Sequence, residues 1–312
     1  MGFSPKSLSC TARWLTLAAL LAWGAASPAL WAAQPGAARV YLTQMASAPD
    51  GAVLRPMDLA LGLYTTVVSG LSFPEYLTCH GGRLYATETF SADSVGAAAS
   101  HLLHGERRMV ESHDFTYHRV LAFDQDGANR HVIVEWDDRL FQPSTAVVAP
   151  DGSLILGSTS KPGAVTAGVW RLRPAPAGGF EAPEPLMAPD RFLPADADFS
   201  RSVRPLGFLP DGGLLIVDAP TQMFGAMGRV LVARGPNLDA IETFVPAFDD
   251  AETGLPFKPV SLALTGDGRV LVTDFTNDKV LAFDLDGRPL GTFAALKSPN
   301  QIAVAPDGLV HV

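Results

Sequence analysis

An internal repeat of short β-strands is the feature that most restricts the fold of this chain. Within residues 259–296, three strongly apolar runs follow one another: VSLAL, RVLVTDF and KVLAFDL. The turn sequences GDG, TND and DLDG separate or bound them, and a weaker run, LGTFAAL, comes next. The pattern then restarts after Ser298-Pro299 as NQIAVAPDG. Four short strands followed by a restart form the unit of a propeller blade, so the sequence predicts an all-β propeller.

The first half of this unit recurs through the chain as a proline, an apolar strand, a glycine turn and a second strand. The copies begin at Phe73, Gln142, Val203, Lys258 and Ser298. Third strands of one type follow at 118–127, 168–174, 228–235 and 278–287, and the fourth strands HVIVEW, IETFVPAF and LGTFAAL are less regular. A β-sandwich would also contain many short strands, but without this ordered self-similarity.

Both ends of the repeat lead to further expectations. TTVVSGL at 65–71 precedes Phe73-Pro74 as LGTFAAL precedes Ser298-Pro299. It is therefore predicted to be an N-terminal closing strand that pairs with the last blade and leaves no open sheet edge. The chain stops at Val312 inside a second strand, which predicts six blades in a complete protein and a truncated C-terminus. An irregular five-bladed ring is the alternative.

The N-terminus has the pattern of a secretory signal peptide. Lys6 and Arg13 precede the apolar run WLTLAALLAWGAA, which is short for a membrane span and ends in small residues. Cleavage is expected after Ala26, with Ala32 as the latest alternative, and an uncleaved anchor is the competing interpretation. The predicted organisation is a signal peptide at 1–26, a leader at 27–62 and a propeller at 63–312 with insertions at 89–117, 175–202 and 247–257.

Charge and cysteine content exclude several classes of function. The net charge is −9, and removing Lys6 and Arg13 with the signal peptide makes it −11. A field of this sign repels nucleic acid and anionic lipid. Cys79 is the cysteine that would remain after cleavage, and its apolar surroundings predict a buried thiol. We expect a secreted or periplasmic monomer with no membrane span in the mature chain.

The sequences PNQIAVAPDGLVHV and VLVTDFTNDKVLAFDLDG resemble NHL-repeat proteins and the related SMP-30/gluconolactonase/LRE-like six-bladed propellers. The resemblance covers about residues 65–312. It implies, in the lactonase branch, Ca²⁺ or another divalent metal at the mouth of the central channel, held by residues that start the innermost strands. Such a metal would polarise a lactone carbonyl and activate water.

The positions that correspond to these ligands hold a mixed set of residues. In chain order they are Glu75, Ser144, Arg204, Val260 and Asn300. Glu75 and Asn300 match the oxygen ligands that the resemblance implies, and Ser144 is compatible with them. Arg204 and Val260 are not, because a guanidinium repels a metal ion and a hydrocarbon cannot ligate one. Arg204 could instead hold an anionic ligand or pair with Glu75.

Three acids end second strands or hold the comparable place, namely Glu88, Asp218 and Asp274, and we expect structural hydrogen bonds from them. Two functions stay open, and the catalytic residues are not predicted. The first is a module that binds a small-molecule ligand or a protein partner at the channel mouth. The second is a calcium-dependent lactone or ester hydrolase with a rearranged metal site.

Overall fold

The computed structural model describes a β-strand protein. The described residues are 15–16, 22–23, 42–44, 51–58, 63–71, 74–91, 116–134, 143–159, 167–187, 192, 201–220, 227–305 and 307–312. Over these ranges the chain forms strands, turns and bends and no helix. Accordingly, none of the described residues belongs to a helix of the length and hydropathy that a bilayer crossing needs.

The described strands form six sheets. The first contains β1 (Leu15–Thr16), β3 (Leu42–Gln44), β4 (Gly51–Asp58) and β5 (Leu63–Leu71). The second contains β2 (Ala22–Trp23), β6 (Pro74–His80), β7 (Arg83–Ser91), β8 (Thr116–Asp124) and β9 (His131–Val134). The third contains β10 (Pro143–Val148), β11 (Leu154–Ser158), β12 (Val169–Leu172) and β13 (Glu184–Met187).

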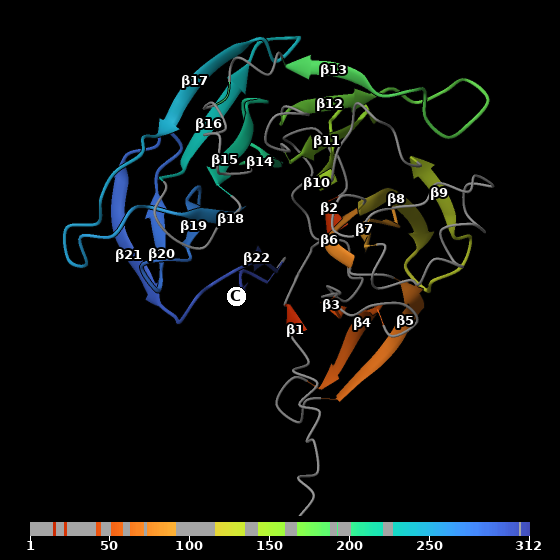
Figure 1. The fold of residues 1–312 in the computed structure, drawn as a ribbon, viewed down its shortest axis with the longest axis horizontal. Coiled ribbons are helices and arrows are strands. Elements are labelled where there is room, and N and C mark those ends of the chain that lie inside the picture. The colour runs from red at the N-terminus through yellow and green to blue at the C-terminus, as the bar shows by residue number, and fades with distance from the viewer. Residues whose placement is uncertain are drawn as a thin grey trace, which may run out of the picture.

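The remaining three sheets follow in chain order. The fourth contains β14 (Arg201–Phe208), β15 (Leu214–Pro220), β16 (Arg229–Arg234) and β17 (Ala240–Val245). The fifth contains β18 (Pro259–Leu264), β19 (Val270–Asp274), β20 (Lys279–Phe283) and β21 (Pro289–Ala295). The sixth is the pair β22 (Ala303–Val304) and β23 (Val310–His311). The sheets stand around a common centre, with β6, β10, β14, β18 and β22 on the inner side (Figure 1).

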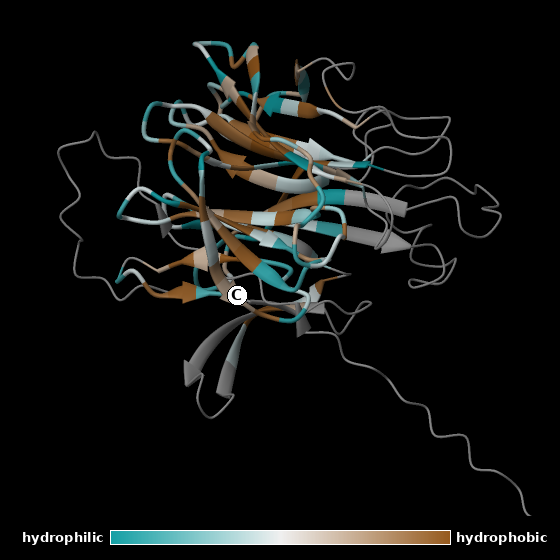
Figure 2. Cartoon of the chain, turned by 90° about the vertical axis from the view of Figure 1, so that its left-hand side faces the viewer, coloured by the Kyte–Doolittle hydropathy of each residue, from teal (hydrophilic) through white to brown (hydrophobic). Residues whose placement is uncertain are grey.

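The hydrophobic core lies between successive sheets. Separate clusters join the first sheet to the second, the second to the third, the third to the fourth, the fourth to the fifth and the fifth to the sixth. The second strands β11, β15 and β19 are buried along their whole length, because both of their faces are covered by neighbouring sheets. Seen from the side, hydrophobic residues concentrate in the strands and hydrophilic residues at the loops (Figure 2).

The repeated turn between third and fourth strands requires glycine because it touches the preceding sheet. Gly127 and Gly287 both have positive φ, at 88° and 80°. A methyl group on Gly127 would overlap the carbonyl of Val67, and one on Gly287 would overlap the carbonyl of Phe244. The glycine of DQDG and DLDG is therefore required for two reasons: its backbone is left-handed, and the neighbouring blade leaves no space for a side chain.

The all-β propeller predicted from the repeat is confirmed, but the role predicted for 65–71 is corrected. β5 pairs with β4, not with the C-terminal strands. Four residues connect β4 to β5, so this pairing closes a much shorter loop than pairing with the other end of the chain. Val53 of β4 is fully buried with Leu71 of β5 in one cluster.

Other strand assignments refine the predicted boundaries. β3 and β4 lie inside the predicted leader, and β1 and β2 lie inside the predicted signal peptide. β13 lies inside the predicted insertion 175–202, where Pro185 obscured a strand that is the outermost of its sheet and therefore tolerates proline. Most of the predicted insertion 89–117 lies outside the described residues. Cys79 is buried, as expected, and burial raises the pKa of its thiol.

Candidate functional site at the propeller centre

The innermost strands bring polar residues from separate blades together. β6 contacts β10, β10 contacts β14, β14 contacts β18, and β18 contacts β22. Each of these strands starts near the position that the repeat predicted for channel residues, so the inner ends of the blades face one another (Figure 1). Side chains that point inward from these strands are the candidates for binding and chemistry.

A hydrogen bond between Tyr76 and Ser261 links the second and fifth sheets across this centre. The Tyr76 hydroxyl and Ser261 Oγ are 3.3 Å apart, although the residues are 185 positions apart in the chain. Ser261 Oγ also accepts from the backbone N–H of Ile302 at 3.4 Å. Thr273 Oγ1 accepts from the Ser261 N–H at 2.9 Å and lies 3.3 Å from the Asn300 carbonyl. Three sheets or their flanking segments therefore meet at one hydroxyl pair.

Two cationic side chains come from β14 and from the residue before β18, and the charge of Arg204 acts on both Tyr76 and Lys258. Arg204 of β14 donates from Nη1 to the backbone carbonyl of Val260 at 3.3 Å, which places the guanidinium beside β18. Lys258 immediately precedes β18 and is only 6% exposed. Its Nζ lies 5.6 Å from the centre of the Phe275 ring. The site therefore combines a buried ammonium, a half-buried guanidinium and an aromatic face.

The electrostatics of the site follow from this packing. Burial, reinforced by the neighbouring positive charge of Arg204, lowers the pKa of Lys258 from 10.5 to about 8. Burial raises the pKa of Tyr76 above its usual value, against the opposing effects of the Ser261 hydrogen bond and the Arg204 charge. Tyr76 is therefore a neutral hydroxyl at physiological pH. The pKa of Lys258, by contrast, lies close to physiological pH.

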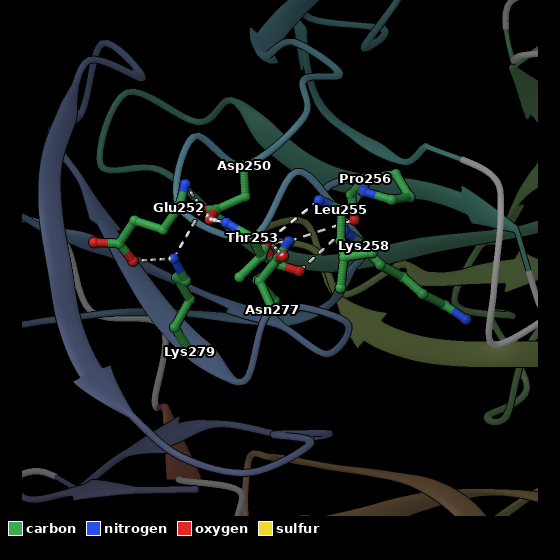
Figure 3. A network of polar contacts seen from close by, with 9 residues as sticks. Asp250, Glu252, Thr253, Leu255, Pro256, Lys258, Asn277 and Lys279 are labelled. Atoms are coloured by element: carbon green, nitrogen blue, oxygen red, sulfur yellow. Dashed lines mark hydrogen bonds and ion pairs between the residues drawn. The ribbon is translucent and has the colours of Figure 1, made fainter.

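A polar network on the outer side of Lys258 holds its backbone in place (Figure 3). Asp274 Oδ1 accepts from the Lys258 N–H at 3.1 Å, and Asp274 Oδ2 accepts from Asn277 Nδ2 at 2.8 Å. Asn277 also bonds the Thr253 hydroxyl and donates to the Pro256 carbonyl at 3.4 Å. The Lys258 side chain extends away from this network, so the backbone is fixed on one side while the ammonium reaches the other (Figure 3).

The predicted insertion 247–257 supplies the rest of this network. Lys279 Nζ donates to Asp250 at 2.8 Å and to Glu252 at 3.0 Å. Burial opposes ionisation of Asp250, but hydrogen bonds from Lys279 and from backbone N–H groups outweigh it and lower the pKa of this carboxyl. The bond to Asp250 raises the pKa of Lys279. The insertion is thus tied to β20 by a buried ion pair and is part of the framework around Lys258.

Comparisons with known proteins agree on the fold. No family model matches the sequence, and no curated protein does. Among solved structures, a gluconolactonase from Xanthomonas campestris matches with a TM-score of 0.55 and 17% identity, covering 94% of this chain and 79% of that one. A second protein, assigned as a gluconolactonase, matches with a TM-score of 0.52 and 16% identity over 85% and 77% of the two chains. The chain has the β-propeller fold of the gluconolactonase-type proteins.

The same fold also carries other chemistry. An α-L-arabinofuranosidase from Fusarium graminearum matches the chain with a TM-score of 0.53 and 10% identity, covering 86% of this chain and 80% of that one. Since folds of this kind host unrelated reactions, the activity of this propeller has to be argued from its own residues.

The structure places the predicted channel residues in different settings. The side chain of Glu75 lies outside the described part of the chain. Ser144 is buried, and its Oγ donates to the Val203 carbonyl at 2.7 Å, which joins β10 to β14. Val260 and Asn300 contribute backbone carbonyls, the first to Arg204 and the second to Thr273. Arg204 thus bonds β18 directly, and Asn300 is linked to β18 through Thr273, which also bonds Ser261. Ser144 instead holds two neighbouring blades together.

The second-strand acids make ion pairs and hydrogen bonds with nearby residues. Glu88 accepts from Arg119 Nε at 2.5 Å. Asp218 is fully buried between Arg229, at 3.0 Å, and Arg201, at 3.7 Å. Asp274 belongs to the network of Figure 3. All three acids stabilise the ends of second strands.

The described side chains at the centre do not fit a divalent metal. They supply two cations, two hydroxyls and a ring, and hydroxyls alone are weak ligands for Ca²⁺. Over the part of the chain that the structure describes, no group of three His, Cys, Asp or Glu side chains could hold a metal ion. Arg204 and Lys258 contribute two positive charges to this part of the ring.

Tyr76, Lys258 and Ser261 were not predicted as site residues. Each is one position away from a residue that the repeat identified or from the proline of its unit: Tyr76 follows Glu75, Lys258 precedes Pro259, and Ser261 follows Val260. Irregular pairing near Pro74 and Pro259 changes the alternation at these strand starts. A lysine directly before a strongly apolar strand was the available signal for Lys258.

Proposed function

We propose that this gluconolactonase-type propeller hydrolyses a lactone or ester at the centre of the ring. The observation that supports the proposal is the buried Lys258, whose pKa is lowered by burial and by the charge of Arg204, three residues before Ser261, whose hydroxyl bonds Tyr76. The fold similarity to gluconolactonases agrees with this class of reaction. The propeller would use its own cations where the resemblance implied a metal ion.

The reaction needs stabilisation of negative charge at one oxygen. Attack of water on the carbonyl carbon forms a tetrahedral oxyanion, which collapses with cleavage of the C–O bond to the leaving oxygen. The products are a carboxylic acid and an alcohol, and the proton lost by water balances the one gained by the leaving oxygen. Arg204 and the protonated Lys258 would stabilise the oxyanion, since fixed donors in a site of low polarity typically contribute 10²–10³-fold in rate.

The test is a hydrolysis screen of sugar lactones and aryl esters with matched variants. Lys258→Met should lower kcat by about 10²-fold, because it removes the buried charge and keeps the apolar stem. Arg288→Met removes the same charge from an exposed turn between β20 and β21 and should leave activity unchanged. Turnover should decline above pH 8 as Lys258 loses its proton, in the wild type and not in Lys258→Met.

Two results would contradict this assignment. One is full activity in Lys258→Met across the whole substrate set. The other is activity that is lost on chelation and restored by Ca²⁺, which would establish a metal site built with Glu75 and Asn300. The experiment therefore separates the two chemical routes to the same reaction.

Binding without turnover is the second candidate function, and the same two cations favour it. A propeller that holds a small anionic ligand or a protein partner at the channel would need the positive centre but no reaction. It is distinguished by saturable binding of an anion with no hydrolysis in the screen. We also propose export and a monomeric state, which N-terminal sequencing of the secreted protein and its mass in solution would test.

A further inference from the structure

We propose that the outer edge of β23, together with the exposed face of β21, is a docking surface for a β-hairpin of a partner polypeptide. One strand of the hairpin would pair with β23, and its glycine-containing turn would pack over Phe293 of β21. This surface uses other residues than the site at the centre of the ring. The inference therefore does not depend on the reaction proposed there.

Each fourth strand carries one unpaired apolar residue at a bulge. In β5, β9, β13, β17 and β21 a shift of register leaves this residue between two paired positions. In chain order the bulge residues are Val67, Ile133, Leu186, Phe244 and Phe293. The first four pack in the hydrophobic cluster that joins their sheet to the next one. The bulge residue is thus the point at which one blade contacts the blade that follows it.

Phe293 differs from the other four bulge residues because it is not covered by a further blade. Its exposed fraction is 38%, whereas that of Phe244, at the same position of the preceding blade, is 5%. Among the described residues, Phe293 belongs to none of the hydrophobic clusters. The Arg269 guanidinium lies 5.7 Å from the centre of its ring and helps to fix the ring's position. Phe293 is therefore a positioned apolar side chain that remains open to a partner.

The second strand of the sixth sheet is also incompletely covered. Val310 stands two residues after the turn glycine Gly308, and it is only half-buried. The residues at the same position in the second to fifth sheets are fully buried, namely Leu84, Leu154, Leu214 and Val270. In those sheets a third strand pairs antiparallel with the second, whereas no described strand pairs with the outer edge of β23. The backbone groups of such an edge are those that an added strand would bond.

The preceding blades indicate the chemistry of a partner that fits this surface. Gly127 closely approaches the carbonyl of Val67, and Gly287 that of Phe244. Each glycine ends a D-x-D-G turn that follows the apolar third strand VLAFD. A hairpin that covers β23 and Phe293 together would therefore combine an apolar strand with a turn of this type. It would need glycine in the turn, because a side chain there would overlap the Phe293 carbonyl.

The test uses a synthetic hairpin with the sequence of residues 278–296, DKVLAFDLDGRPLGTFAAL, as the probe. Calorimetric titration into the wild-type protein should show saturable binding of one hairpin per chain. The same peptide with Gly287→Ala should bind at least about tenfold more weakly, since its turn is left-handed and closely packed. This comparison requires no variant of the protein itself.

Variants of the protein locate the bound hairpin. Phe293→Ser should lower the affinity for the hairpin by at least about tenfold, as is typical when a central aromatic anchor is truncated. Val132→Ser is the matched control, because Val132 also lies on a fourth strand and is 37% exposed, and it should leave the affinity unchanged. In the wild type, hydrogen exchange at the outward amides of β23 should slow when the hairpin is added, since strand pairing protects them.

Three outcomes would overturn the inference. The first is the absence of binding, or equal affinity of the wild type and Phe293→Ser for the hairpin. The second is binding that leaves hydrogen exchange in β23 unchanged, because the hairpin would then occupy another surface. The third is a wild type that dimerises in solution while Phe293→Ser stays monomeric, because a second copy of this chain would then cover Phe293. None of these measurements involves turnover, so they leave the proposed hydrolysis to its own test.

Discussion

Replacing Lys258 with methionine should change how the stability of the propeller depends on pH. The folded-state pKa of Lys258 is about 8, against 10.5 for an unperturbed lysine. Below pH 8 both the folded and the unfolded chain carry the proton, and the folded state bears the cost of the buried charge. Between these two values the unfolded chain binds the proton and the folded chain does not, so the free energy of unfolding rises with pH.

The size of this effect follows from the difference in pKa. One pKa unit corresponds to about 1.4 kcal/mol, so complete relief of the charge would add at most roughly 3 kcal/mol to the free energy of unfolding. Water that reaches the ammonium would reduce this value. Between pH 7 and pH 10, Lys258 should contribute roughly 2 kcal/mol of added stability. Methionine has a similar apolar stem and no charge, so Lys258→Met should lack this contribution.

Urea unfolding of the wild type and Lys258→Met at pH 7, 8, 9 and 10 measures the contribution directly. The difference between the two proteins cancels the contributions of the other groups whose protonation changes across this range. The stability of the wild type relative to the variant should rise by roughly 2 kcal/mol across the series. Parallel curves for the two proteins would refute the claim that the centre of the propeller disfavours the ammonium, and with it the electrostatic basis of the proposed site.

Two further predictions test the framework. Tyr76→Phe and Ser261→Ala should each lower the free energy of unfolding by about 1 kcal/mol, and the double variant should cost less than the sum, because both remove one hydrogen bond across the centre. Thermal or urea unfolding measures this, and full additivity would contradict the cross-ring contact. Gly287→Ala should cost at least ~2 kcal/mol through overlap with the Phe244 carbonyl at positive φ, whereas Gly291→Ala, which has positive φ but open space around it, should cost about 1 kcal/mol. Equal costs would show that the blades do not approach closely at this turn.

The repeat predicted the strands well because each blade repeats one local pattern. β15 and β19 are fully buried, and their continuous apolar runs are visible in the sequence. The pairing of β5 was harder to predict. β4 contains Arg55 and Pro56, which interrupt the alternation expected of a strand, and its assignment depends on the burial of Val53 against other strands. Local patterns identify strands, but the choice of partner depends on packing.

The repeat indicated which positions of each blade would lie at the centre of the ring, but it did not indicate which residues would gather there. The repeat predicted that residues at the starts of inner strands would line the channel, and it indicated that Arg204 would not suit a metal site. It could not show that Lys258 reaches the same centre, because a lysine before a strand is usually solvated. Its burial depends on tertiary contacts such as the packing against Phe275 and the backbone bond to Asp274, which are far from evident in the sequence.

The insertion 247–257 explains why this propeller can keep a buried lysine at its centre. Its ion pair with Lys279 and the Thr253–Asn277 contact brace the turn after β19. Asn277 in turn bonds Asp274, which accepts the Lys258 N–H. The unfavourable charge is therefore attached to a backbone that is fixed by several hydrogen bonds. Under the proposed hydrolysis, a backbone held in this way would support the preorganised charge that stabilises an oxyanion.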